Sequence, residues 1–227
     1  MSADLQVFNS FTNFIKNISD LDTLVYSNSS LDVASSYNVK LQDEVGATDV
    51  SFIILDSIDD APFTSDIDNL LVNRYFRFID SNSNNVDIRI VDYDNTTGEI
   101  TLESALGEIV SAGSTYNIEV LSSVFIRPLN KSTIGGQTRF SNRGIRFDMI
   151  IKTKEDSNKI KTITLQDKIT TAIGEYRVAE IKDDLDNAVG YMNFADEPSY
   201  VETTDDEDQF IKYLGSVPVT YYVNNRS

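Results

Sequence analysis

Alternation of apolar and polar residues over residues 47–122 constrains the fold of this chain more than any other feature. Short apolar segments follow one another there, and turn residues separate each segment from the next. Phe76 and Phe78 fall on one face of such a segment and Arg77 on the other, as in a half-buried strand. Four or five strands at this spacing predict a small β-barrel or sandwich.

The segments on either side of this block predict a different architecture. Residues 1–18 and about 159–173 have apolar residues at helical spacing, which predicts two amphipathic helices. Residues 144–153 and 209–223 alternate, which predicts long strands. The residues expected to be buried are Leu5, Phe8, Phe11, Phe14, Ile15 and Ile18 in the first helix, Ile160, Ile163, Ile169, Ala172 and Ile173 in the second, Ile145, Phe147, Met149 and Ile151 in the first long strand, and Val217, Val219, Tyr221 and Val223 in the last.

We therefore expect the α+β fold class: a small sandwich of an antiparallel sheet and two helices, with an inserted all-β domain. The α+β domain is discontinuous and comprises residues 1–34 and 123–227, and the inserted barrel or sandwich comprises residues 35–122. An insertion of this kind is tolerated at an exposed loop whose two ends lie close together.

Prolines, glycines and polar runs predict where the elements of the α+β domain end. Pro128 ends a strand, and a polar loop follows over residues 130–143. Gly174 ends the second helix. Residues 197–209 form an acidic loop. Pro218 places the last strand at a sheet edge or a bulge, because proline cannot donate to a β-ladder.

The composition excludes several kinds of site. The 227 residues include no His, Cys or Trp, so Ser–His and Cys–His catalysis, zinc sites built from His or Cys, and disulfides are excluded. No run of about 18 apolar residues predicts a membrane-spanning helix. Sequence alone identifies no glycosidase pair among the 36 acids. We expect no catalysis, no cofactor and no membrane contact.

Two acidic segments are candidate cation sites, but a simpler structure is favoured for each. Asp92 and Asp94 begin a segment with the spacing of a calcium loop, but Thr97 occupies the sixth position, where that loop has glycine. A plain hairpin that ends at Gly98 is therefore favoured. The second segment is a run of four acids, for which a solvated loop is favoured over a cation site. It consists of Asp205, Asp206, Glu207 and Asp208.

Charge is distributed unevenly along the chain. The net charge of −17 divides into −15 for residues 1–126, +6 for residues 127–168 and −8 for residues 169–227. The acidic excess argues against general nucleic-acid binding. The basic segment predicts either a solvated surface or an interface with carboxylates of a neighbouring subunit. The candidate interface residues are Arg127, Lys131, Gly135, Gly136, Arg139, Arg143 and Arg146, with the run from Asp205 to Asp208 as an acidic interface or ring lumen.

Two parts of the chain resemble phage virion proteins. One part resembles a small β-module that recurs in those proteins, and the matching residues are Arg74 to Phe78, Arg89 to Asp94, Gly98 to Ala105 and Gly113 to Ile118. The other part resembles the tail terminator proteins of long-tailed phages in layout and alternation. It comprises the first helix and about the last 100 residues, and the best matches are Gly144 to Thr153 and Tyr213 to Val223.

The second resemblance implies a structural role in the virion. Tail terminators are small α+β proteins that form a hexameric ring, which caps the tail tube and joins it to the head. The resemblance implies a homohexamer in the neck, assembled in the host cytoplasm, with the tail tube protein and head-completion or neck proteins as partners and the tail sheath as a further candidate. Genomic DNA would pass through without specific binding. The alternatives are another neck, tail-tube or baseplate protein, or a carbohydrate-binding fibre or adhesin module.

Overall fold

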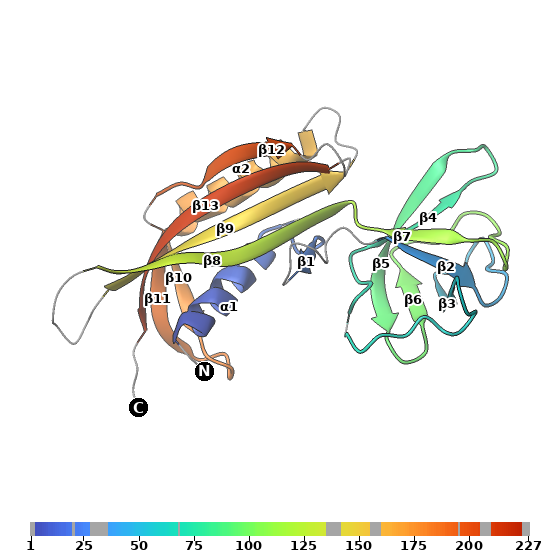
Figure 1. Cartoon of the computed structure of the whole chain (residues 1–227), viewed down its shortest axis with the longest axis horizontal. Helices are drawn as coiled ribbons and strands as arrows, with labels where there is room; N and C mark the ends of the chain where they lie inside the picture. Colours follow the sequence, from blue (N-terminus) through green and yellow to red (C-terminus); the bar gives the residue numbers. More distant parts are fainter. Residues whose placement is uncertain are drawn as a thin grey trace. The chain divides into compact units, whose positions relative to one another are not determined.

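Two units share the chain (Figure 1). The first comprises residues 1–30 and 122–227 and consists of a curled sheet with two helices, and the second comprises residues 31–121 and is a β-barrel. The predicted boundaries, after residues 34 and 122, differ from these by a few residues at most. The computed structural model describes residues 3–19, 21–27, 36–67, 69–134, 142–154, 160–194, 196–204 and 210–223.

Six antiparallel strands close the second unit into a barrel in the order β2-β3-β6-β5-β4-β7. Their bounds are β2 Tyr37–Leu41, β3 Ser51–Asp56, β4 Tyr75–Ile79, β5 Asn85–Asp94, β6 Glu99–Leu102 and β7 Tyr116–Glu119. The barrel-like module is thus confirmed, but the expected four or five strands were too few. Part of β2 was expected to be a loop, because its two buried apolar residues, Val39 and Leu41, form too short an alternation to indicate a strand.

The interior of the barrel contains the residues that the alternation placed inward. Phe76 and Phe78 are buried, as is Ile100 on β6. The ring of Phe52 meets that of Phe76 edge-on, with 5.3 Å between the ring centroids. The turn from β5 to β6 contains Gly98 at a φ of 75°, a conformation that favours glycine.

Seven strands form the sheet of the first unit in the order β1-β8-β9-β13-β11-β10, and β12 also pairs with β13. Every pair is antiparallel except β1–β8, which corrects the expected antiparallel sheet. A parallel pair requires a long crossover connection, and here the whole barrel unit is that connection. The bounds are β1 Val25–Ser27, β8 Ser122–Ile134, β9 Asn142–Lys154, β10 Val178–Lys182, β11 Ala188–Phe194, β12 Ser199–Thr204 and β13 Phe210–Val223.

The Pro218 end of β13 was expected at a sheet edge or a bulge, but β13 lies inside the sheet and pairs with β9 through Pro218 without a register shift. One side of β13 pairs with β9, and the other pairs first with β12, as far as Ser216, and then with β11, from Val219 onward. Pro218 lies in the gap between those two partners, where a missing N–H is tolerated. The expected acidic loop over residues 197–209 contains β12, because its residues find a long-range partner in β13.

Pro128 does not end its strand, which is a second correction. Strand β8 continues to Ile134 and pairs with β9 beyond the proline, so the expected loop over residues 130–143 is in part strand. On its other side, β8 pairs with β1 only at Ser123–Phe125. Pro128 therefore lies on an edge that has no partner in the described part of the chain, a position that proline tolerates.

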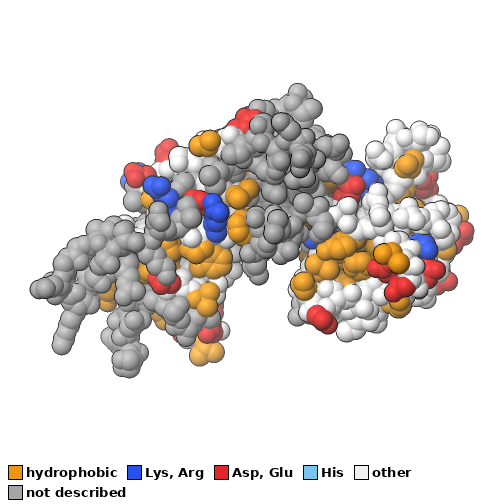
Figure 2. Space-filling model, viewed as in Figure 1, with side chains coloured by type: hydrophobic (Ala, Val, Ile, Leu, Met, Phe, Trp, Pro, Cys, Tyr) orange, Lys and Arg blue, Asp and Glu red, His pale blue; other side chains and the backbone are white. Residues whose placement is uncertain are grey.

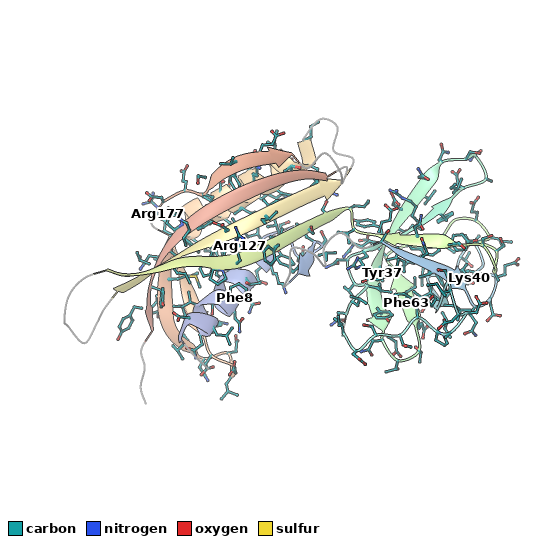
Figure 3. The ribbon with its side chains drawn as sticks, in the orientation of Figure 1. Phe8, Tyr37, Lys40, Phe63, Arg127 and Arg177 are labelled. Atoms are coloured by element: carbon teal, nitrogen blue, oxygen red, sulfur yellow. The ribbon has the colours of Figure 1, made fainter. Side chains whose placement is uncertain are left out.

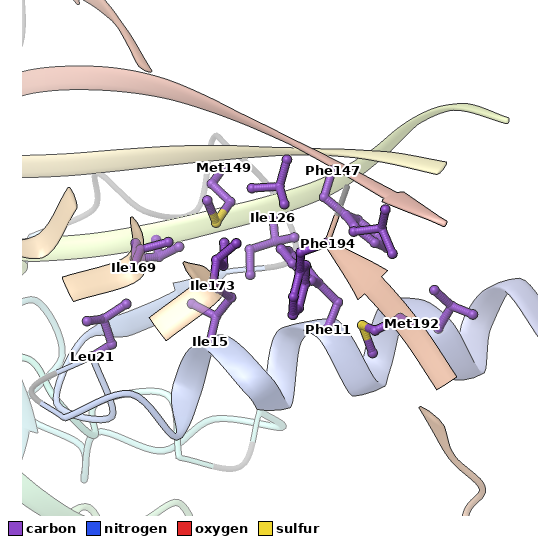
Figure 4. Packing of buried hydrophobic residues seen from close by; sticks show 14 of the residues in the cluster. Phe11, Ile15, Leu21, Ile126, Phe147, Met149, Ile169, Ile173, Met192 and Phe194 are labelled. Carbon is purple, nitrogen blue, oxygen red and sulfur yellow. The ribbon is translucent and has the colours of Figure 1, made fainter. Parts of the chain in front are cut away.

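Both helices pack on the same face of the sheet (Figure 4). They are α1, Ala3–Lys16, and α2, Ile160–Tyr176. Phe11 of α1 stacks on Phe147 of β9 with 4.2 Å between the ring centroids, and Ile169 of α2 belongs to the same core. Burial of these side chains removes apolar area from water, which is the main stabilising contribution in such a layer.

The first turn of α2 is rotated relative to the prediction. Ile160 and Ile163 are exposed, and Thr162 and Leu165 take the inward positions instead. The hydroxyl of Thr162 hydrogen-bonds that of Thr153 on β9 in the buried interior. A threonine can occupy a core position because this bond satisfies its hydroxyl, and that bond is not visible in an apolar pattern.

The ends of the helices also differ from the prediction. Helix α2 continues through Gly174, and Arg177 adopts a positive φ of 35° immediately after the helix. The N–H of Arg177 donates to the carbonyl of Ile173 at 3.1 Å, which closes the last turn. In α1, Leu5 is 45% exposed rather than buried.

Candidate functional site

The sheet of the first unit has one face that neither described helix covers. The inward residues of β8, β9 and β13 form a core with both helices, so the residues that alternate with them point the other way. Tyr191 and Val201 are on this second face and are 51% and 60% exposed. We call this surface the open face and define it by Phe125, Arg127, Arg146, Asp148, Ile150, Tyr191 and Val201.

An ion pair between neighbouring strands lies within the open face. Arg127 of β8 is directly opposite Asp148 of β9, and its Nη2 lies 3.2 Å from Oδ2 of the aspartate. The aspartate side chain is only 5% exposed and the arginine side chain is 48% exposed. Asp148 alternates with the inward residues Phe147 and Met149, so the alternation places it on the polar side of the strand, and its burial comes from the packing of the sheet.

Arg146 lies two residues from Asp148 on β9 and is exposed. In the described part of the chain, no ion pair or side-chain hydrogen bond of this arginine is found. Its guanidinium is therefore available to a carboxylate from another molecule, which it can bind through two hydrogen bonds. Arg127 and Arg146 are thus two of the candidate interface residues that share one surface.

The other candidate residues are only partly located. Lys131 lies in β8 and Arg143 lies in β9, so neither belongs to the expected loop, and their side chains are outside the description. Gly135, Gly136 and Arg139 lie outside the described residues. The same holds for the acidic run Asp205, Asp206, Glu207 and Asp208.

The barrel unit is strongly acidic. Residues 31–121 hold 17 acids and 4 bases, a net charge of −13. Lys40 pairs with Asp60 at 2.6 Å. Figure 2 shows Asp and Glu side chains spread around a hydrophobic patch on the visible side of the barrel, and Figure 3 labels Tyr37, Phe63 and Lys40 on this unit.

The three arginines of the barrel are engaged as well. Arg74 is buried, donates from Nε to the carbonyl of Leu70 at 2.9 Å and lies 5.0 Å above the ring of Tyr37. Arg89 pairs with Glu103 at 2.7 Å. Since Lys40 and these arginines all contact groups of the barrel itself, the charge left to interact with other molecules is negative.

Arg77 pairs with two carboxylates on the outside of the barrel, and all three side chains are at least partly buried. Its Nε and Nη2 donate to the two carboxylate oxygens of Asp87 at 2.6 and 2.8 Å, and its Nη1 lies 3.0 Å from Glu119. These side chains come from three neighbouring strands, β5, β4 and β7. Beside them, burial raises the pKa of Tyr75, and the positive charge of Arg89 partly offsets this rise.

The segment that begins at Asp92 is a hairpin, as the sequence analysis favoured. Oδ1 of Asp94 accepts hydrogen bonds from the N–H and the hydroxyl of Thr96 at 2.8 and 2.6 Å. These bonds lower the pKa of Asp94 to about 2. In the described part of the chain, no group of three or more carboxylates is placed to hold a metal ion.

Among the described residues, two of the surface hollows are large enough to consider, and neither was identified from the sequence. One is a groove of about 780 Å³ between the C-terminal part of α1 and α2, lined by Phe14, Ile18, Asp167, Lys168 and Glu175 among others. The other is a pocket of about 380 Å³ on the barrel, beside β4 and β7. Both are lined by residues distant in sequence, so no local motif marks them.

Neither described helix is long and apolar enough to cross a membrane.

Comparisons with models of protein families, with curated proteins and with solved structures find no match to this chain.

Proposed function

We propose that this protein is a structural subunit of a phage virion that forms a ring at the head–tail junction, in the manner of a tail terminator. The observation that carries the proposal is the open face. It presents exposed apolar side chains at Tyr191 and Val201 together with the exposed Arg146, which has no ion-pair partner among the described residues. Such a mixture is typical of surfaces that other protein molecules cover.

The charges of the chain support assembly with further copies of itself. The barrel has a net charge of −13 and its bases contact the barrel's own groups, whereas the open face presents Arg127 and Arg146. Different surfaces of one chain are thus complementary in charge. An interface between two different surfaces of the same chain is heterologous. It produces a closed ring when the rotation that relates neighbouring subunits brings the last copy into contact with the first.

The proposed location of this ring in the virion rests on the resemblance to tail terminators. The ring would be a homohexamer in the virion neck, in contact with the tail tube protein and with head-completion or neck proteins. An acidic lumen would repel the phosphates of DNA, so the genome would pass without specific binding. Other neck, tail-tube and baseplate roles share the assembly surface but differ in copy number.

Mass photometry of the purified full chain tests the assembly step. We expect a closed oligomer at low salt that dissociates when Arg146 is replaced by Glu and is retained in Arg146→Lys. Lys161→Glu makes the same charge change on α2, away from the open face, and serves as the matched control. A chain that stays monomeric, or an oligomer indifferent to Arg146→Glu, would contradict the proposed assembly surface.

Electron microscopy of intact particles tests the place of the protein. An antibody against the chain should label the neck, at one ring of subunits per particle. Labelling along the tail, with many copies per particle, would indicate a tube protein instead. Labelling at the distal end of the tail would indicate a baseplate or fibre role.

A further inference from the structure

The pocket on the barrel has the lining of a small-molecule binding site. It lies beside the neighbouring strands β4 and β7 and the loop that precedes β7 (Figure 1). Its volume of about 380 Å³ is within the range of about 300–1,000 Å³ that ligand sites occupy. Apolar side chains and polar groups both contribute to its walls.

The charged groups of the pocket are already engaged with the barrel itself. Arg77 binds Asp87 through two hydrogen bonds and also pairs with Glu119. Glu108 accepts a hydrogen bond from the backbone N–H of Ser81 at 3.1 Å, which ties the pocket loop to the turn between β4 and β5. A charged ligand would therefore have to compete with bonds that stabilise the fold.

The groups that remain for a ligand are neutral. Asn85, Asn117, Ser114 and Thr115 line the pocket, and among the described residues none forms a side-chain hydrogen bond with them. An amide offers two donors and one carbonyl acceptor, and a hydroxyl can both donate and accept. Such a set is suited to a ligand that carries several hydroxyl or amide groups.

Apolar surface lies at the same place. Ile79 and Ile109 line the pocket and are 67% and 64% exposed. Two contacts hold the side chain of Tyr116 in place. Its hydroxyl donates to the carbonyl of Ser111 at 2.7 Å, and its ring packs against that of Phe76 with 5.5 Å between the centroids. Aromatic and aliphatic side chains of this kind can pack against the C–H face of a sugar ring.

We propose that this pocket binds a neutral saccharide. Neutral hydroxyl and amide donors beside exposed apolar side chains match a ligand with many hydroxyl groups and apolar C–H faces. An extended peptide is disfavoured because its usual mode on a sheet is to pair with an open edge, and this barrel is closed. The activity goes beyond the proposed ring and is independent of it, because the pocket belongs to the barrel and the open face belongs to the other unit.

The test uses the purified full chain and an array of immobilised neutral and acidic oligosaccharides, followed by titration calorimetry with the best neutral one. We expect binding to neutral members. Asn117→Ala and the isosteric Thr115→Val should each weaken binding between about threefold and tenfold, as expected for one lost neutral hydrogen bond. Asn38→Ala is the matched control, since Asn38 pairs with Asn117 across the strands but does not line the pocket.

Three outcomes would overturn the proposal. The first is the absence of binding to any neutral saccharide at millimolar concentration. The second is binding to acidic saccharides only, which would indicate a site built on the cations. The third is binding that neither Asn117→Ala nor Thr115→Val weakens, although both variants keep the circular dichroism spectrum of the parent protein. None of these outcomes bears on the ring.

Discussion

Nη2 of Arg127 lies 3.2 Å from Oδ2 of Asp148 on the neighbouring strand, and the carboxylate is buried while the guanidinium is half exposed. Replacement of Arg127 by Ala would leave a buried carboxylate without its cation. We expect a loss of about 2 kcal/mol in the free energy of unfolding, below the range for a fully buried pair because the arginine is partly solvated. Urea denaturation followed by circular dichroism measures this loss.

Arg146→Ala provides the comparison for this prediction. Arg146 is exposed on the same open face, and its removal leaves no buried charge. We expect a change within about 0.5 kcal/mol, as for most surface substitutions. Equal losses for the two variants would show that the Arg127–Asp148 pair makes no specific contribution.

The outside of the barrel offers a sharper contrast between two arginines. Arg77 is nearly buried between Asp87 and Glu119, whereas Arg89 pairs with the mostly exposed Glu103. Arg77→Ala should cost about 3 kcal/mol, because it leaves two poorly solvated carboxylates close together. Arg89→Ala should cost about 1 kcal/mol or less. Thermal denaturation of both variants in parallel checks the order, and a larger loss for Arg89→Ala would contradict it.

The elements that were predicted correctly are those in which apolar residues recur at a regular spacing within the element itself. Phe76 and Phe78, or Phe147 and Met149, are buried because a strand places every second side chain on one face. This local rule was enough to recognise the barrel-like block and the long strand β9. It required no knowledge of which strand lies beside which.

The elements that sequence missed depend on distant partners. Strand β12 consists largely of polar residues and is a strand only because β13 pairs with it. Pro218 indicated a sheet edge or a bulge because proline cannot donate to a β-ladder. In the structure it lies where the partner of β13 changes from β12 to β11, and the sequence gives no sign of that change. Thr162 is inward because Thr153 satisfies its hydroxyl.

In the candidate site, too, some residues could be predicted from a local pattern and others depend on distant parts of the chain. The basic segment indicated Arg127 and Arg146, but the burial of Asp148 depends on how the sheet packs. Tyr191 could have been identified from the sequence, because it alternates with Met192 along β11 and is therefore an aromatic residue on the side of the strand that faces away from the core. The barrel pocket combines residues from β4 and from the loop before β7, so only the fold brings them together.

The carboxyl of Asp94 should titrate at an unusually low pH. Hydrogen bonds from Thr96 lower its pKa from an ordinary value of 3.8 to about 2. Because the folded-state pKa is depressed, the stabilisation is present above about pH 4 and is lost as the pH falls toward 2. Thr96→Val should raise the pKa of Asp94 toward 3.8.

An NMR titration of the side-chain carboxyl carbons measures that change. The carboxyl of Asp80 is an internal control, because hydrogen bonds from Asn84 in a different turn lower its pKa. It should titrate identically in the parent protein and in Thr96→Val. Because Thr96→Val keeps the backbone hydrogen bond and removes only that of the hydroxyl, an unchanged pKa of Asp94 would show that the Thr96 hydroxyl does not lower it.

Gly98 combines a left-handed backbone with a close approach to another part of the barrel. Its φ is 75°, and a Cβ there would lie 2.9 Å from the carbonyl oxygen of Ile54 and from the nitrogen of Phe63. Gly107 has a similar φ of 82° but open space around its Cα. Gly107→Ala should cost about 1 kcal/mol for the backbone conformation alone, and Gly98→Ala about 3 kcal/mol because backbone atoms must also move. Chemical denaturation of the two variants separates these contributions, and equal costs would show that the β5–β6 turn can move away from Phe63.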